Sequence, residues 1–350
     1  MNRRRHPAVL ALVVITTALG CAAITRAVLQ AGSSDPSLGR NLPTDVPPED
    51  PGKAYLRFLV VGDWGTGGEG QRKVADAMVE RATRVPVDLV LMTGDNFYPD
   101  GVTSVDDPQW RGSFEQMYLR GALASVPFYA VLGNHDYRGN PEAQLEYSRT
   151  HPAFVMPARY YAFTRDLADG TRVDFFALDT TPLVDGSPGS QEQLEWFRGA
   201  LSTSRAPWKI VMAHHPLYSV GVHGNSPVMQ RLVEDLLVEH RVQAYFSGHD
   251  HHLELHKPVR GVHHVVSGAG GGLDRPYPAD WSDQALYVAT RGGFVAARLD
   301  REQLVLEFVR PDARTQFAYT LPRCSSENTR VPCPEDQTGD AGVSVQEPAP

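Results

Sequence analysis

Short apolar runs alternate with amphipathic segments along the first part of the folded chain. The runs with the length and continuous hydrophobicity of buried strands are Leu56–Val61, Val87–Met92 and Pro127–Leu132. The segments that repeat apolar residues at helical spacing are Val74–Ala82 and Trp110–Leu119. The resulting order β-α-β-α-β predicts a sheet covered by helices.

The second half continues this alternation with shorter elements. Strands are predicted at Tyr160–Thr164, Arg172–Asp179, Trp208–Ala213 and Ala244–Ser247, and helices at Gln191–Leu201 and Val228–Glu239. Further short strands are predicted at residues 262–266, 286–290, 293–299 and 304–309. These late strands are expected to form a second sheet that packs on the first. Residues 139–158, which contain Pro152 and Pro157, are expected to be an irregular loop.

Potential metal ligands follow five of the predicted strands. They are Asp63, Asp95 with Tyr98, Asn134 with His135, His214, and His249 with His251. Each has an ordinary alternative: a Gly-Asp pair after a strand is often only a turn, and a single histidine is often a packed core residue. Packing alone does not account for oxygen or imidazole donors at five strand ends, where open α/β sheets hold their ligands. We therefore expect these side chains to form one site.

The composition argues against two classes of function, nucleic-acid binding and zinc binding by thiolates. The chain has 350 residues, of which 42% are hydrophobic, and a formal net charge of −8. Beyond the N-terminus it has no long Lys/Arg run, which argues against a nucleic-acid surface. The three cysteines, Cys21, Cys324 and Cys333, form no C-x-x-C pair, so a thiolate zinc site is not expected. Cys324 and Cys333 could pair as a disulfide if the protein is exported.

The two ends of the chain differ from its centre. Arg3–Arg5 precede the apolar stretch Ala8–Ile24, which predicts a signal peptide or N-terminal anchor over residues 1–30. A flexible linker is predicted over 31–53, one folded domain over 54–321, and a polar, disordered tail over 322–350. We therefore expect export to a secreted, periplasmic or membrane-anchored location. Whether the signal is cleaved, lipidated at Cys21 or retained stays open.

Five sequence blocks together resemble the purple acid phosphatases, in particular the small tartrate-resistant, mammalian-type enzymes, within the calcineurin-like dinuclear metallophosphoesterases. The blocks are Gly62-Asp63-Trp64-Gly65, Gly94-Asp95-Asn96-Phe97-Tyr98, Gly133-Asn134-His135-Asp136, Val211-Met212-Ala213-His214 and Gly248-His249-Asp250-His251. The resemblance covers roughly residues 55–270. It implies that residues 54–321 form an α/β metallophosphoesterase domain: a four-layer α-β-β-α sandwich of two mixed sheets packed face to face, with helices outside.

The resemblance implies two metal ions. The first is Fe³⁺, held by Asp63, Asp95, Tyr98 and His251. The second is a divalent ion (iron, zinc or manganese), held by Asp95, Asn134, His214 and His249. This division agrees with ligand chemistry, because phenolate and carboxylates suit a trivalent ion, while imidazoles and an amide suit a divalent one. The charges of such a site leave it positive overall, which favours an anionic phosphate ester.

The expected reaction is hydrolysis of phosphate monoesters by a metal-activated hydroxide. His135 is expected to protonate the leaving group, and His223 resembles the family's second substrate-facing histidine. Asp136 either orients His135 or is a turn residue. His215 and His252 stand where the resemblance leads one to expect an aromatic residue and an asparagine, so they could alter the surroundings of the ligands.

Two alternatives stay open at this point. One is a metal-dependent phosphodiesterase or nucleotide phosphatase of the same fold, and the other is a non-catalytic, metal-binding surface protein. The expected partners are small phosphorylated substrates and no nucleic acid, with a membrane tether through the N-terminus as one option. We expect the protein to be a monomer.

Overall fold

The computed structural model describes residues 44–272 and 283–323, which form two seven-stranded mixed sheets. The order in the first sheet is β14-β13-β12-β1-β2-β3-β4. Its strands are β1 (Leu56–Val61), β2 (Leu89–Met92), β3 (Phe128–Ala130), β4 (Phe154–Val155), β12 (Phe294–Leu299), β13 (Gln303–Val309) and β14 (Thr315–Pro322). Strands β1 to β4 run parallel, and β12 pairs antiparallel with β1.

The second sheet has the order β11-β9-β10-β8-β7-β6-β5. Its strands are β5 (Tyr161–Asp166), β6 (Arg172–Ala177), β7 (Trp208–Met212), β8 (Ala244–Ser247), β9 (Leu253–His256), β10 (His263–Ser267) and β11 (Ala285–Ala289). Strands β6, β7, β8 and β10 are parallel neighbours in this sheet.

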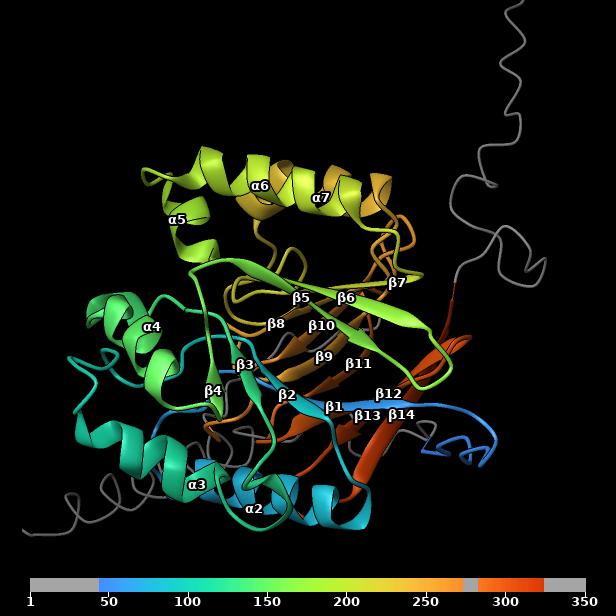
Figure 1. The fold of residues 1–350 in the computed structure, drawn as a ribbon, viewed down its shortest axis with the longest axis horizontal. Coiled ribbons are helices and arrows are strands. Elements are labelled where there is room, and N and C mark those ends of the chain that lie inside the picture. Colours follow the sequence, from blue (N-terminus) through green and yellow to red (C-terminus); the bar gives the residue numbers. More distant parts are fainter. Residues whose placement is uncertain (1–43, 273–282, 324–350) are drawn as a thin grey trace, which may run out of the picture.

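Helices cover the outer faces of the sheets. Helix α2 (Glu69–Arg84) and α3 (Gln116–Tyr118), which continues a π-helical turn (Trp110–Glu115), lie outside the first sheet, whereas α6 (Ser190–Thr203) and α7 (Pro227–Glu239) lie outside the second (Figure 1). The shorter helices are α4 (Pro141–Thr150) and α5 (Thr180–Asp185), and 3₁₀ turns occur at Gly121–Leu123 and Asp136–Arg138. The predicted four-layer sandwich is confirmed.

The main core lies between the two sheets. Phe58 of β1 packs edge-on against Phe175 of β6 and Phe246 of β8, with ring centroids 5.8 and 6.0 Å apart. Since all three rings are buried, they join the sheets by hydrophobic contact rather than by backbone hydrogen bonds. A second cluster, which includes Phe197 and Val233, lies under α6 and α7. The second sheet is thus covered by apolar side chains on both faces.

The prediction that the late strands form the second sheet is wrong for two of the four predicted strands, those that correspond to β12 and β13. Strands β12, β13 and β14 belong to the first sheet, beside β1, whereas β10 and β11 belong to the second. All six residues of β12 are buried, as a central strand requires. Strands β9 and β14 were not predicted. The apolar pattern identifies a buried strand but does not identify its partner.

The expectation of an irregular loop at residues 139–158 is also wrong. Helix α4 begins with Pro141 at its first turn, where a missing N–H is tolerated, and β4 then pairs with β3. Helix α5, which begins directly after Asp179, was not predicted either. These short elements carry too few apolar positions for their periodicity to be recognised.

The structure describes the last ten residues of the predicted linker. Residues 44–53 of the predicted linker pack on the domain: Glu49 accepts hydrogen bonds from Arg57, and the carbonyl of Pro47 accepts one from Arg298. The predicted signal segment, Cys21 and the Cys324–Cys333 pair lie outside the described residues. Within 44–272 and 283–323, no helix has both the length and the apolar character needed to span a bilayer.

Candidate metal centre

The predicted metal ligands come from neighbouring strand ends of both sheets. Asp63 follows β1, Asp95 and Tyr98 follow β2, Asn134 follows β3, His214 follows β7, and His249 and His251 follow β8. Because β1, β2 and β3 are parallel, and β7 and β8 are parallel, their carboxyl ends meet at one edge of each sheet. The hydrogen bond from the His249 backbone N–H to Asp63 Oδ2, 2.9 Å long, joins the two edges.

One group of donors surrounds the hydroxyl of Tyr98. Tyr98 Oη lies 3.0 Å from Asp63 Oδ1, 2.9 Å from Asp95 Oδ2 and 3.1 Å from His251 Nε2. His251 Nε2 is in turn 3.5 Å from Asp63 Oδ1. These are the side chains that the resemblance assigns to the first ion, and the structure brings all of them together.

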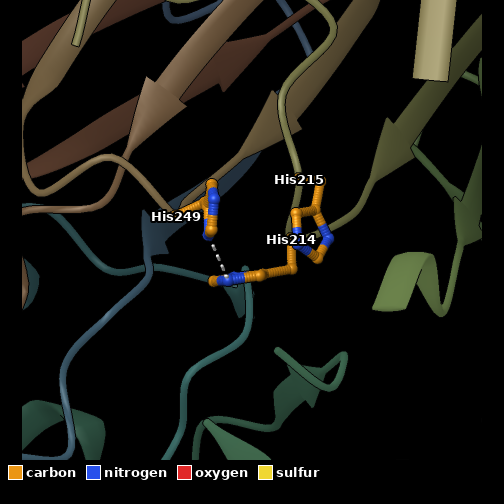
Figure 2. Close-up of side chains that lie close together, drawn as sticks. All are labelled: His214, His215 and His249. Atoms are coloured by element: carbon orange, nitrogen blue, oxygen red, sulfur yellow. Dashed lines mark hydrogen bonds between the residues drawn. The ribbon is translucent and has the colours of Figure 1, made fainter. Parts of the chain in front are cut away.

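A second group surrounds the amide oxygen of Asn134. His214 Nε2 and His249 Nδ1 each lie 3.0 Å from Asn134 Oδ1. These two nitrogen atoms are 3.2 Å from each other, and Figure 2 shows the two rings. Asp95 Oδ1 lies 3.5 Å from His214 Nε2. Asp95 therefore directs Oδ2 to the first group and Oδ1 to the second, the arrangement expected of a carboxylate that bridges two cations.

The surroundings of the acidic donors disfavour their charged, deprotonated forms. Burial, with the neighbouring Asp95 carboxylate, raises the pKa of Asp63 well above its ordinary value. Burial and the carboxylates of Asp63 and Asp95 likewise raise the pKa of Tyr98. Burial lowers the pKa values of His214 and His249, and neighbouring imidazoles lower that of His249 further.

Bound cations would reverse these effects, so the donors fit metal ions. A positive charge between Asp63, Asp95 and Tyr98 favours their deprotonated forms and relieves the repulsion between the two carboxylates. The neutral imidazoles of His214 and His249 are already in the protonation state that metal binding needs. The oxygen-rich group suits a hard ion, and the imidazole-rich group suits a borderline one.

Three of these residues have strained backbones. Asp63, Asp95 and His249 have φ values of 55°, 49° and 71°, in the left-handed region that costs free energy for residues with a side chain. Asp and His tolerate it better than most residues. The Asp63 N–H donates to the carbonyl of Gly94, which helps to hold the turn.

Asp136 organises the loops that carry Asp95 and Asn134. Its carboxylate accepts hydrogen bonds from the backbone N–H groups of Asn96, Phe97 and Gly133 and from Nε2 of Gln144. It forms no hydrogen bond with the imidazole of His135. Of the two options left by the sequence, the turn-forming one is therefore correct, and Asp136 does not orient His135 directly.

The two histidines predicted to be catalytic lie at the edge of the cluster. His135 Nε2 is 4.0 Å from Asp95 Oδ2, and its Nδ1 is 2.5 Å from the carbonyl oxygen of Pro99. A carbonyl only accepts, so Nδ1 carries a proton. The ring of His223 lies 4.2 Å from that of His249, and its side chain is exposed. Both imidazoles therefore border the donor groups.

His215 lies beside the second group. Nitrogen atoms of His214, His215 and His249 all lie within 4.8 Å of one another (Figure 2). His215 Nδ1 is 2.9 Å from the hydroxyl of Thr180, the first residue of α5. In contrast, His252 is buried with its Nε2 2.8 Å from Glu254 Oε2. Its imidazole therefore interacts with Glu254, which is not one of the predicted metal ligands.

Sequence reasoning missed a second set of polar residues near the site. Asp179, after β6, is buried and accepts a 2.5 Å hydrogen bond from the hydroxyl of Tyr137, which also accepts from Arg159. Burial raises the pKa of Asp179 to about 7. The sequence feature that could have identified Asp179 as a site residue is its position after a parallel strand. The residue was missed because that strand was predicted to include it.

Comparison with known proteins finds relatives that match most of this chain. A sequence model described as calcineurin-like phosphoesterase matches residues 56–253. "Tartrate-resistant acid phosphatase type 5" of Homo sapiens is 29% identical over 298 residues, which cover 77% of this chain and 91% of that protein. "Purple acid phosphatase 4" of Arabidopsis thaliana is 32% identical over 277 residues, covering 72% and 79%.

Solved structures share the fold. "GAP50 the anchor in the inner membrane complex of Plasmodium" superposes with a TM-score of 0.72 at 25% identity, covering 79% of this chain and 91% of that one. The purple acid phosphatase PPD1 of yellow lupin has a TM-score of 0.60 at 19% identity, covering 79% and 55%, and supports the fold alone.

Proposed function

Because the chain belongs to the calcineurin-like phosphoesterase family, and within it to the purple acid phosphatases, we propose that it is a dinuclear-metal acid phosphatase that hydrolyses phosphate monoesters. One observation carries this proposal. Two groups of donors share Asp95, one built on Tyr98 and the other on Asn134, His214 and His249. Small phosphorylated molecules are the substrate class.

The donor chemistry supports two different ions. Asp63, Asp95, Tyr98 and His251 would hold ferric iron, and Asp95 with Asn134, His214 and His249 would hold a divalent iron, zinc or manganese ion. When bound, the two ions supply the positive charge that attracts a phosphate ester and acidify the water that attacks phosphorus.

The remaining steps belong to histidines of this chain. His135 lies close enough to Asp95 to stand beside the reacting phosphate, and its Nδ1–H bond to Pro99 fixes the ring so that Nε2 faces the site. When protonated, Nε2 donates its proton to the departing alkoxide oxygen. His223 stands over His249 on the other side, where its imidazolium would bind a phosphate oxygen. Both roles favour acidic pH.

The proposal is tested by metal analysis joined to a visible spectrum and an assay. The protein, loaded with iron and zinc and oxidised, should bind two ions per chain, absorb visible light through a tyrosinate-to-iron band, and hydrolyse para-nitrophenyl phosphate. Asp95→Asn should bind fewer ions and lose turnover. A colourless, inactive protein with both ions bound would overturn the proposal in favour of a non-catalytic role. Faster turnover of bis-para-nitrophenyl phosphate would favour the phosphodiesterase alternative.

Export is the expected setting of this activity. Arg3–Arg5 and the apolar stretch Ala8–Ile24 support a signal peptide or anchor. A fusion of residues 1–60 to a reporter that folds only after export should be active, and replacing Arg3, Arg4 and Arg5 with glutamate should reduce that activity. An equally active reporter in both fusions would count against the signal.

A further inference from the structure

The backbone of His223 is hydrogen-bonded, whereas its imidazole forms no hydrogen bond with another described residue. Its side chain is exposed, although its ring lies 4.2 Å from that of His249. It belongs to a loop, residues 217–226, closed by the hydrogen bond from the Ser226 N–H to the Leu217 carbonyl. Whatever fixes this loop therefore fixes the imidazole.

Asp250 binds the loop directly. This buried residue lies between His249 and His251, and the mechanism above does not use it. Its Oδ1 accepts the backbone N–H of His223 at 2.9 Å, and its Oδ2 accepts the hydroxyl of Ser219 at 2.5 Å. Ser219 Oγ in turn accepts the N–H of Gly221 at 2.9 Å. Charged acceptors make such bonds stronger than neutral ones do.

Glu254 binds the same loop from the neighbouring strand. Glu254 is fully buried in β9, and its Oε2 accepts the backbone N–H of Val220 at 2.9 Å. His252 Nε2 and His256 Nδ1 lie 2.8 and 2.7 Å from its two oxygens. The two histidines hold this carboxylate in one orientation, so its bond to the loop has a fixed direction.

The loop lies directly against the Asp250 carboxylate. A Cβ atom added at Gly221 would come within 2.3 Å of Asp250 Cγ and 2.6 Å of both its oxygens. Real Cβ atoms do not approach so closely, so only glycine allows this contact. Shape and hydrogen bonding therefore fix the same backbone position.

We propose that Asp250 and Glu254 are positioning residues: they clamp loop 217–226 to the segment that carries His249 and His251, and so hold His223 over the site. The inference rests on the proposed function for its catalytic consequence. The clamp itself is a property of the fold. Neither carboxylate needs to touch the substrate.

Variants of Ser219 and Gly221 in the loop and of Glu254 in β9 test the clamp without replacing a predicted metal ligand. Ser219→Ala, Gly221→Ala and Glu254→Gln should each lower kcat roughly five- to thirty-fold, since a displacement of about 1 Å can cost about 100-fold. Metal content should stay at the wild-type level. Ser219→Thr, which keeps a hydroxyl, should recover activity. The controls Ser190→Ala and Glu307→Gln, which remove comparable hydrogen-bonding groups elsewhere, should leave kcat unchanged.

A double-mutant cycle separates positioning from general destabilisation. If Ser219 acts through His223, Ser219→Ala should lower kcat in the wild-type background and have little further effect in His223→Ala. Equal losses in both backgrounds would overturn the proposal, as would unchanged kcat in Ser219→Ala, Gly221→Ala and Glu254→Gln.

Hydrogen exchange tests the clamp independently of activity. The amide protons of Val220, Gly221 and His223 should exchange faster in Ser219→Ala and Glu254→Gln than in the wild type, while those of β8 stay protected. If the wild type proves inactive but these amides respond, the proposed function fails and the clamp stands. If the enzyme is active and these amides do not respond, only the clamp fails.

Discussion

Asp95 and Tyr98 show how much of this site depends on single side chains. Asp95 faces both donor groups, with one oxygen toward each. Tyr98 is the one phenol among the proposed ligands, and its hydroxyl is within 3.1 Å of donors from Asp63, Asp95 and His251. Because the two residues are only three positions apart on one loop, a single strand end supplies both the bridge and the phenolate.

The first prediction concerns Tyr98. Replacing Tyr98 with phenylalanine should remove the visible band, because no phenolate then reaches the iron. Tyr137→Phe is the matched control and should keep the colour, since Tyr137 bonds to Asp179 and Arg159 instead. The visible spectra of the two iron-loaded variants provide the test. A coloured Tyr98→Phe protein would show that another group supplies the band.

The second prediction concerns Asp179. Burial raises its folded-state pKa to about 7, although Tyr137 and Arg159 oppose this shift. Its contribution to the free energy of unfolding is thus fully present below its unfolded-state pKa, near 3.8, and is lost as pH rises through about 7.

Asp179→Asn should remove this pH dependence. The variant should gain stability relative to wild type by up to about 1.4 kcal/mol for each pH unit between these two values. Urea unfolding of both proteins at pH 4, 6 and 8 measures the difference. A difference that does not change with pH would contradict the raised pKa.

At the scale of elements, some loops after the parallel strands are packed so tightly that only glycine fits. Gly133 follows β3, and a Cβ atom there would lie 2.2 Å from Asp95 Oδ1 and 2.3 Å from the Asp95 backbone nitrogen. The close approach lets β2 and β3 present Asp95 and Asn134 side by side.

The third prediction follows from this contact. Gly133→Ala should displace Asp95 and lower both metal content and kcat, whereas the overall fold should survive because the change lies at a strand end. Gly199→Ala, in α6 and with nothing within 4 Å of the added Cβ, should leave both unchanged and stabilise the helix by about 0.5–1 kcal/mol. Wild-type metal content in Gly133→Ala would contradict this packing argument.

At the scale of the whole molecule, the site lies where the strand ends of the two sheets meet. Asp63, Asp95, Tyr98 and Asn134 belong to the first sheet's edge, and His214, His249 and His251 to the second. Metal ions held by both edges would therefore act as a link between the layers. Without them, the buried carboxylates of Asp63 and Asp95 oppose each other.

The fourth prediction is that metal removal destabilises the fold. An ion at 1,000 times its dissociation constant adds about 4 kcal/mol to the free energy of unfolding, so chelation should lower Tm clearly. Without metal, the Asp63→Asn variant should have a higher Tm than the wild type. Adding metal should raise the Tm of this variant only a little. Calorimetry of both proteins with and without metals would show this. A wild-type Tm that does not respond to chelation would argue against ions linking the sheets.

The sequence by itself determined the local features of this protein. Strands such as β1 and β7, and helices such as α2 and α7, are recognisable because their apolar periodicity is carried by consecutive residues. The predicted ligands were recognisable because polar residues directly follow these strands. Their roles in binding metal stay predictions, but the structure gathers all of them at one place.

Only the tertiary structure decided which distant segments meet. The apolar pattern of β12 is the same whether it pairs with β1 or with a strand of the second sheet, so its place in the first sheet could not be deduced. The same holds for Asp250 and Glu254, whose bonds to loop 217–226 join segments about thirty residues apart. Strand pairing and buried hydrogen bonds depend on three-dimensional neighbours, and local periodicity contains no information about them.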